Sequence, residues 1–116
     1  MMRQFFLTAM LTVAALPAFA DALATGDEIT AAIAGNTVQG DMMSSGAYTE
    51  FYQADGVIRG KDYTGQWTVE GDQMCFDYGD GPDCWSVRIS GQEVTWVKDG
   101  ADDGTGTILT GNPNNF

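Results

Sequence analysis

The sequence predicts a mainly β protein: a small antiparallel meander of about eight short strands, closed as a barrel or packed as a sandwich, with one short N-terminal helix. Two observations predict this fold class. From Asn36 onward, short β-prone runs are separated by glycine-containing turns about every ten residues. Within several runs, apolar and polar side chains alternate, as they do on a strand with one buried face.

The helix is predicted just before the first strand. Residues 25–28, Thr-Gly-Asp-Glu, fit a capping box, in which the threonine hydroxyl and the glutamate carboxylate each accept a free backbone N–H. Ile29, Ala32 and Ile33 then form a narrow apolar stripe, and Gly35 stands where a left-handed residue would end the helix. A helix this short is unstable alone in water, so it must pack on the sheet.

The strands follow from the runs between turns. Each turn pair can supply the positive φ of a tight hairpin, so consecutive strands should be antiparallel neighbours. The turn pairs are Ser45-Gly46, Asp55-Gly56, Gly71-Asp72, Ser90-Gly91 and Asp99-Gly100. The predicted strands are residues 37–39 (open to extension as far as 42), 48–53, 57–60, 66–70, 73–78, 85–89, 94–98 and 105–109.

Alternation also predicts which side chains face inward. The core candidates are Trp67, Val69, Trp85, Val87 and Ile89, with Val94 and Trp96 on the next strand. Val97 is apolar as well, so that strand is either covered on both faces or has Val97 at an edge. Because the chain carries many large aromatic side chains, we expect a filled interior rather than a large cavity. Residues 111–116 have no periodicity and are expected to lie as a tail on the barrel.

The N-terminal residues predict export. Arg3 precedes an uncharged apolar stretch over residues 5–16, and Ala18 and Ala20 provide the small side chains that signal peptidase requires. We therefore expect a signal peptide at residues 1–20 and a single compact β domain at 21–116. The apolar stretch is too short to span a bilayer. The expected location is periplasmic or extracellular, and the protein is expected to be a monomer.

Cys75 and Cys84 are the two cysteines of the chain, and both lie in the part predicted to be exported. An even cysteine count in an oxidising compartment predicts a disulfide between them. A metal site would need two further nitrogen or sulfur ligands, and the sequence contains no histidine.

The composition excludes several classes of function. The formal net charge is −11, and loss of Arg3 with the signal peptide makes it −12, which disfavours binding to nucleic acid or to anionic lipid. Without histidine there is no Ser/His/Asp or Cys/His catalytic set. No glycine-rich nucleotide-binding motif opens a helix after a strand. We therefore expect no catalytic residues, no cofactor and no bound metal.

Two oxygen-based possibilities remain open. A two-carboxylate hydrolase could draw on Glu50, Asp55, Glu70 or Asp77, the acids closest to aromatic residues, although acids on such strands usually face solvent. Calcium could bind to the aspartate-rich loops at residues 77–83 and 99–104, which are equally typical of ordinary turns.

A recognition surface is a third possibility. Tyr48, Tyr52 and Tyr63 lie close in sequence to Arg59 and Lys61, the one concentrated pair of basic residues after residue 20. Exposed aromatic side chains beside two cations could dock a protein or small-molecule partner. The alternative is ordinary cross-strand aromatic packing beside two surface charges.

The chain resembles a family of small, uncharacterised exported bacterial proteins. The resemblance lies in residues 23–29, 35–38, 48–60 with the pattern F-Y-x-A-D-G, 65–67, 74–78, 84–85 and 104–114. It implies membership and no particular activity. Some relatives carry the label dihydrodipicolinate reductase, which is not supported here, because that enzyme has a nucleotide-binding domain and a catalytic histidine.

A looser similarity links Gly65-Gln66-Trp67 and the cysteine pair to small periplasmic β-barrel inhibitors of secreted metalloproteases. This similarity concerns architecture, which does not imply function. The sequence as a whole predicts an exported cell-envelope protein that acts as a non-enzymatic binding or structural β-barrel module. The alternatives are a carboxylate-based hydrolase of envelope glycans and a periplasmic protein resembling protease inhibitors.

Overall fold

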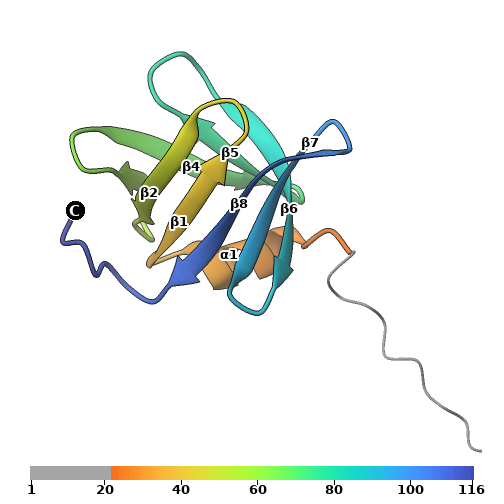
Figure 1. Ribbon diagram of the computed structural model, residues 1–116, viewed down its shortest axis with the longest axis horizontal. Helices are drawn as coiled ribbons and strands as arrows, with labels where there is room; N and C mark the ends of the chain where they lie inside the picture. The colour runs from red at the N-terminus through yellow and green to blue at the C-terminus, as the bar shows by residue number, and fades with distance from the viewer. Residues whose placement is uncertain (1–21) are drawn as a thin grey trace, which may run out of the picture.

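The computed structural model describes residues 22–116, which form eight antiparallel strands closed into a barrel and one short helix (Figure 1). The predicted signal peptide lies outside the described residues. The strands are β1 (Asn36–Met42), β2 (Gly46–Tyr52), β3 (Val57–Arg59), β4 (Thr64–Glu70), β5 (Gln73–Asp77), β6 (Asp83–Ser90), β7 (Glu93–Lys98) and β8 (Ala101–Leu109). Each strand pairs with the next, and β1 pairs with β8 to close the barrel. The predicted mainly β meander is confirmed in its barrel form.

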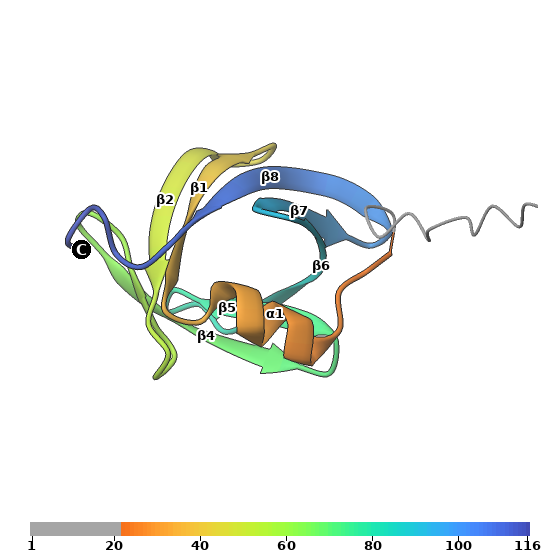
Figure 2. The same cartoon turned by 90° about the horizontal axis from the view of Figure 1, so that it is seen from below.

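Helix α1 (Gly26–Ile33) forms where the capping box predicts it. The Thr25 hydroxyl accepts from the Glu28 backbone N–H at 3.2 Å, and the Glu28 carboxylate accepts from the Thr25 N–H at 3.1 Å. Gly35 has a φ of 77°, the left-handed conformation expected after the helix. Ile29 and Ile33 are fully buried against β1, β4 and β5, so α1 covers one end of the barrel (Figure 2).

All eight predicted strands are present, and most are longer than predicted. The largest difference is at β8, which begins at Ala101 instead of residue 105. Asp99 and Gly100 alone make the turn before it, with φ angles of 50° and 80°. Two consecutive residues with positive φ give a two-residue hairpin loop, so the residues that follow enter the sheet at once. Most of the predicted 99–104 loop is therefore strand.

The two ends of the barrel differ. In a meander, alternate connections lie at the same end, so β2–β3, β4–β5 and β6–β7 are joined beside α1. The β1–β2, β3–β4, β5–β6 and β7–β8 connections surround the opposite end, called here the open end (Figure 1). Beside α1 the interior is filled by buried aliphatic side chains, namely Ile29, Ile33, Val38, Ile58, Met74 and Ile108.

The predicted core residues face inward. Trp67 and Val87 are buried, and Val69, Trp85 and Ile89 pack partly buried against the same core. On β7, Trp96 and Val97 are both buried, so this strand is covered on both faces there. The pairing with β8 shifts between these two residues, because Trp96 lies opposite Gly104 while Val97 lies opposite Asp102. The extra residue of this bulge is Asp103 of β8, so the alternation of Trp96 and Val97 along β7 is unchanged.

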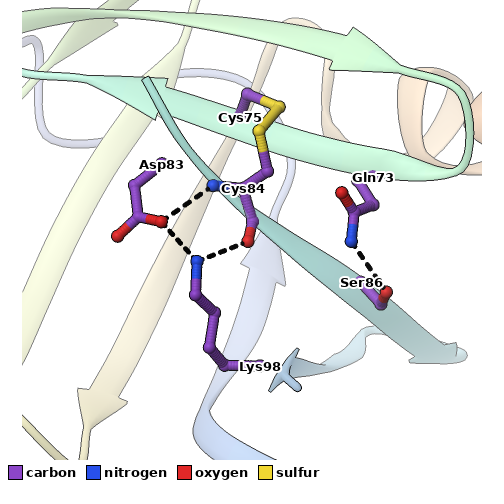
Figure 3. Close-up of a disulfide and its surroundings, with 6 residues drawn as sticks. All are labelled: Gln73, Cys75, Asp83, Cys84, Ser86 and Lys98. Atoms are coloured by element: carbon purple, nitrogen blue, oxygen red, sulfur yellow. Dashed lines mark hydrogen bonds and ion pairs between the residues drawn. A yellow bond between two sulfur atoms is a disulfide. The ribbon is translucent and has the colours of Figure 1, made fainter. Parts of the chain in front are cut away.

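The predicted disulfide joins Cys75 of β5 to Cys84 of β6 (Figure 3). The two residues lie directly opposite each other, with their Cα atoms 4.0 Å apart. Because Met74 and Phe76 face the interior, Cys75 between them lies on the outer side of the sheet. Lys98 donates to the Cys84 carbonyl at 2.8 Å and to the Asp83 carboxylate. These contacts bind β7 to the same corner of the barrel.

The C-terminal residues 111–116 lie on the barrel as predicted. The Thr37 hydroxyl donates to the Gly111 carbonyl at 2.7 Å, and the Gly111 N–H donates to the Asn36 side chain at 3.0 Å. Asn112 and Phe116 bond to each other through side chain and backbone. Between residues 22 and 116, no helix has the length and apolar character needed to cross a bilayer.

Candidate ligand-binding site

A cavity of about 460 Å³ opens at the end of the barrel opposite α1. Its size lies within the range of small-molecule sites. The expectation of a filled interior is therefore correct beside α1 and wrong at the open end. The lining is mostly aromatic and comes from β1, β2, β5, β6 and β7 and the connections at that end: Met42, Ser44, Ser45, Ala47, Tyr48, Glu50, Tyr52, Tyr63, Phe76, Tyr78, Asp83, Trp85 and Trp96.

Glu50 faces this cavity from β2 and is 5 % exposed. The expectation that it faces solvent is wrong. Its position follows from the pleat, because Tyr48, Glu50 and Tyr52 alternate along β2 and share the inner face. Tyr52 is the anchor of this face, since it is 1 % exposed and packs on Trp67 and Phe76. Burial of Tyr52 therefore brings Glu50 inside as well.

Three tyrosine hydroxyls donate to the Glu50 carboxylate. Tyr52 bonds to Oε1 at 2.9 Å, Tyr63 bonds to Oε2 at 2.9 Å, and Tyr78 lies 2.9 Å from both oxygens. A carboxylate has about four acceptor positions, and three phenol hydrogens point at this one, that of Tyr78 being shared between the two oxygens. Two ion pairs occur in residues 22–116, Arg88 with Asp102 and Lys98 with Asp83, and neither includes Glu50. The buried charge is thus held by neutral donors.

The fourth tyrosine belongs to a second chain of hydrogen bonds. The Trp96 indole N–H donates to the Tyr48 hydroxyl at 2.7 Å, and that hydroxyl donates to the Thr105 carbonyl at 2.9 Å. At the rim, the Trp85 indole N–H donates to the Asp103 carboxylate at 3.0 Å. All four tyrosines of the sequence therefore line this one cavity, together with two of its three tryptophans.

The environment raises the pKa of every tyrosine. Burial raises the pKa of Tyr48 to about 12, with the negative charge of Glu50 as a further cause. Burial likewise raises the pKa of Tyr52, Tyr63 and Tyr78 well above the usual value, and the Glu50 charge is in each case the next cause. The four phenols therefore stay neutral hydrogen-bond donors at and well above neutral pH.

Glycines make room for three of these rings. A Cβ at Gly60 would collide with the Tyr63 ring, and a Cβ at Gly65 would come within 2.8 Å of the Tyr78 ring. On β8, the inward positions 104 and 106 are also glycine, and a Cβ at Gly106 would meet the Tyr48 hydroxyl. The absence of a side chain at Gly106 thus leaves room for the hydroxyl end of Tyr48, one of the lining residues.

Asp83 lines the cavity, and it is paired with Lys98, which lies outside the lining. The Lys98 ammonium lies 4.4 Å from the centre of the Trp85 ring. It donates to Asp83 and to the Cys84 carbonyl (Figure 3). Asp83 is therefore paired, unlike Glu50. Ser44 and Ser45, in the β1–β2 connection, are exposed.

The other acids proposed from sequence do not join Glu50. Asp55 and Glu70 are exposed, Asp77 accepts from the Gly79 N–H at 2.8 Å, and none of the three lines the cavity. In the loops considered for calcium, four aspartates bond to other groups: Asp77 to the Gly79 N–H, Asp83 to Lys98, Asp102 to Arg88 and Asp103 to Trp85. Within residues 22–116, no three acidic, histidine or cysteine side chains are grouped closely enough to hold a metal ion.

The exposed recognition surface considered for Tyr48, Tyr52 and Tyr63 is not found at the place expected from the sequence. These tyrosines do come together, but they line the barrel interior, and Tyr63 alone among them is 44 % exposed. Arg59 and Lys61 are not part of the lining. The missed signal is on β2, where Tyr48, Glu50 and Tyr52 occupy alternate positions. A carboxylate between two aromatic residues on one strand face indicates a polar group inside the barrel.

Comparison of the chain with protein-family models, with curated proteins and with solved structures finds no match.

Proposed function

We propose that this protein is a non-enzymatic binding module of the cell envelope that holds a small ligand in the open end of its barrel. One observation carries the proposal: a cavity of about 460 Å³ whose walls are aromatic and whose polar groups are fixed in place by hydrogen bonds. Eight-stranded barrels are wide enough to enclose one small ligand, and preformed aromatic cavities with few polar groups are typical of ligand sites.

The chemistry of the cavity favours binding over catalysis. A general base must reach the proton it takes, and the Glu50 carboxylate is buried and already accepts from three tyrosine hydroxyls. Ser44 and Ser45 line the cavity without a histidine that could activate them, since the chain has none. Both cysteines are in the disulfide. The polar side chains of the cavity are therefore held in place by hydrogen bonds, which suits the binding of a ligand better than its chemical conversion.

Export is part of the proposal. The Cys75–Cys84 disulfide is typical of proteins in oxidising compartments, and the sequence of residues 1–20 has the order of zones found in signal peptides. A stable barrel with a strongly acidic surface suits a binding protein that is free in the periplasm or the medium.

Nuclear magnetic resonance tests the binding function through the three indole N–H signals. Trp85 and Trp96 line the cavity, whereas Trp67 lies outside it and donates to the Gln53 carbonyl. We expect that a panel of aromatic fragments of positive, neutral and negative charge contains compounds that shift the Trp85 and Trp96 signals and leave the Trp67 signal in place. If no compound of any charge shifts the first two signals selectively, the proposed function is wrong.

A further inference from the structure

We propose that the ligand is an organic ammonium ion, that is, a protonated amine carried on an aromatic or apolar group. This inference rests on the proposed function and names its ligand class. It follows from three properties of the cavity taken together: which hydrogen-bonding groups are still free, what charge is unbalanced, and what the walls are made of.

The aromatic side chains of the cavity have no hydrogen-bond donor left to offer. The hydroxyls of Tyr52, Tyr63 and Tyr78 donate to Glu50, and that of Tyr48 donates to the Thr105 carbonyl. The indole N–H groups of the two lining tryptophans are also used, by Tyr48 and by Asp103. A ligand that must receive hydrogen bonds, such as a carboxylate or phosphate, would find none from these groups.

Acceptors, in contrast, remain free. A tyrosine hydroxyl can accept a hydrogen bond as well as donate one, so donation of its hydrogen leaves its acceptor capacity free. The oxygens of Tyr52, Tyr63 and Tyr78 therefore keep acceptor capacity around Glu50, while one acceptor position of Tyr48 is taken by Trp96. The cavity thus favours a ligand that donates hydrogen bonds. The exposed hydroxyls of Ser44 and Ser45 can donate or accept, so they favour neither a ligand that donates hydrogen bonds nor one that accepts them.

The charge of the cavity is negative and unbalanced. Glu50 is buried, and no lysine or arginine lines the cavity. The second lining acid, Asp83, is already paired with Lys98. A second negative charge beside Glu50 would be repelled strongly, because water does not screen charges well at a buried site. A positive charge would be stabilised for the same reason, and the net charge of −11 attracts cations from a distance.

The walls of the cavity suit a cation. Ammonium groups are attracted to the faces of tryptophan and tyrosine rings, and aromatic walls with a nearby carboxylate are a recurrent way of binding amines. One of the lining rings already does this within the protein, since the Lys98 ammonium lies 4.4 Å from the centre of Trp85. The remaining rings, Phe76, Trp96 and the tyrosines, can contact the apolar part of the same ligand.

Three probes of similar size and different charge test the inference: phenethylamine, phenylethyl alcohol and phenylacetate. Isothermal titration calorimetry of each with the purified protein at neutral pH measures the affinities. We expect the ammonium to bind at least about tenfold more tightly than the alcohol, and the carboxylate to show no binding. The Trp85 and Trp96 indole signals should shift with the ammonium, which locates the binding in the cavity.

A pair of variants tests whether Glu50 is the source of the preference. Glu50→Gln removes the charge and keeps the size of the side chain, and we expect it to reduce the preference for the ammonium over the alcohol to about twofold or less. Glu70→Gln is the matched control, because Glu70 is exposed on β4 and lies outside the cavity. It should leave the affinities unchanged.

The outcomes separate this inference from the proposed function. If the alcohol or the carboxylate binds in the cavity as tightly as the ammonium, the ligand class is wrong while the binding function stands. If the ammonium is preferred equally in wild type and in Glu50→Gln, the assignment of the preference to Glu50 is wrong. If neither these probes nor the wider fragment panel shifts the Trp85 and Trp96 signals, both proposals are wrong.

Discussion

Burial of the Glu50 carboxylate has an unfavourable free energy that its hydrogen bonds must offset. Removal of a carboxylate from water is unfavourable, and without a cationic partner the loss of hydration is offset only by hydrogen bonds. Tyr52, Tyr63 and Tyr78 provide charge-assisted bonds of this kind. An apolar residue at position 50 would leave the hydroxyl of the buried Tyr52 without its acceptor. Glu50 and the three tyrosines therefore depend on one another.

Substitution of Glu50 should change the titration of its tyrosine neighbours. After burial, the Glu50 charge is the largest cause that raises the pKa of Tyr63 and Tyr78. We expect Glu50→Gln to lower the pKa of both, measured by the ultraviolet absorbance of tyrosinate as a function of pH. Glu70→Gln, on the exposed face of β4, serves as the control and should titrate like wild type. Identical curves for all three proteins would show that Glu50 does not contact these phenols.

At the scale of elements, β8 shapes the cavity through what it lacks. Its inward positions are Gly104, Gly106 and Ile108, so the strand is empty at the open end and filled beside α1. The space beside Gly106 is taken by the Tyr48 hydroxyl and by Val38, so this glycine lets a lining tyrosine pack against the strand. The floor is formed by Phe76, which contacts Trp85 and Trp96 at ring-centroid distances of 5.5 and 5.4 Å.

A methyl group on Gly106 should disturb the cavity directly. The added Cβ would collide with the Tyr48 hydroxyl and with Val38. We expect Gly106→Ala to destabilise the protein by about 1 to 3 kcal/mol, as overpacking typically does, and to weaken the Trp96–Tyr48 hydrogen bond. Urea denaturation and the Trp96 indole signal measure the two effects. Thr105→Ala on the same strand is the control, since the Thr105 side chain is exposed; equal stability of the two variants would contradict this view of β8.

The disulfide should matter for stability and little for architecture. It joins residues of β5 and β6 that already lie opposite each other, with a sequence separation of 9. Closure of so short a loop lowers the conformational entropy of the unfolded chain, which should stabilise the fold by about 2 to 3 kcal/mol. We expect the double variant Cys75→Ser/Cys84→Ser to lose about this amount in urea denaturation and to keep its β-type circular dichroism. Loss of the β spectrum would mean that the strand pairing depends on the bond.

At the scale of the whole molecule, local signals predicted most of the fold. Turn pairs marked five of the seven connections between strands, and the Thr25 capping box with Gly35 marked the helix. Closure between β1 and β8 was not predictable, because a sandwich satisfies the same local patterns. Glu50 was identified as a candidate acid but assigned to the wrong face, since its burial depends on Tyr52 packing against residues far along the sequence.

The stability of the whole barrel should fall in alkaline solution. Tyrosines of the unfolded chain ionise near pH 10.0, whereas burial holds the pKa of Tyr48 at about 12 and those of the other three above the usual value. Above pH 10 the unfolded chain therefore loses protons that the folded chain keeps, so the free energy of unfolding decreases as pH rises. This stabilisation is fully present below pH 10. Denaturation midpoints at about pH 8 and about pH 11 measure the loss.

A spectrophotometric tyrosine titration of the native protein tests the central claim most directly, because all four tyrosines of the chain lie around the cavity. If they surround a buried carboxylate as described, tyrosinate absorbance should stay absent through pH 10.0, the usual pKa, and should appear at higher pH together with unfolding. A reversible titration of the four phenols near pH 10.0 in the folded protein would contradict the account.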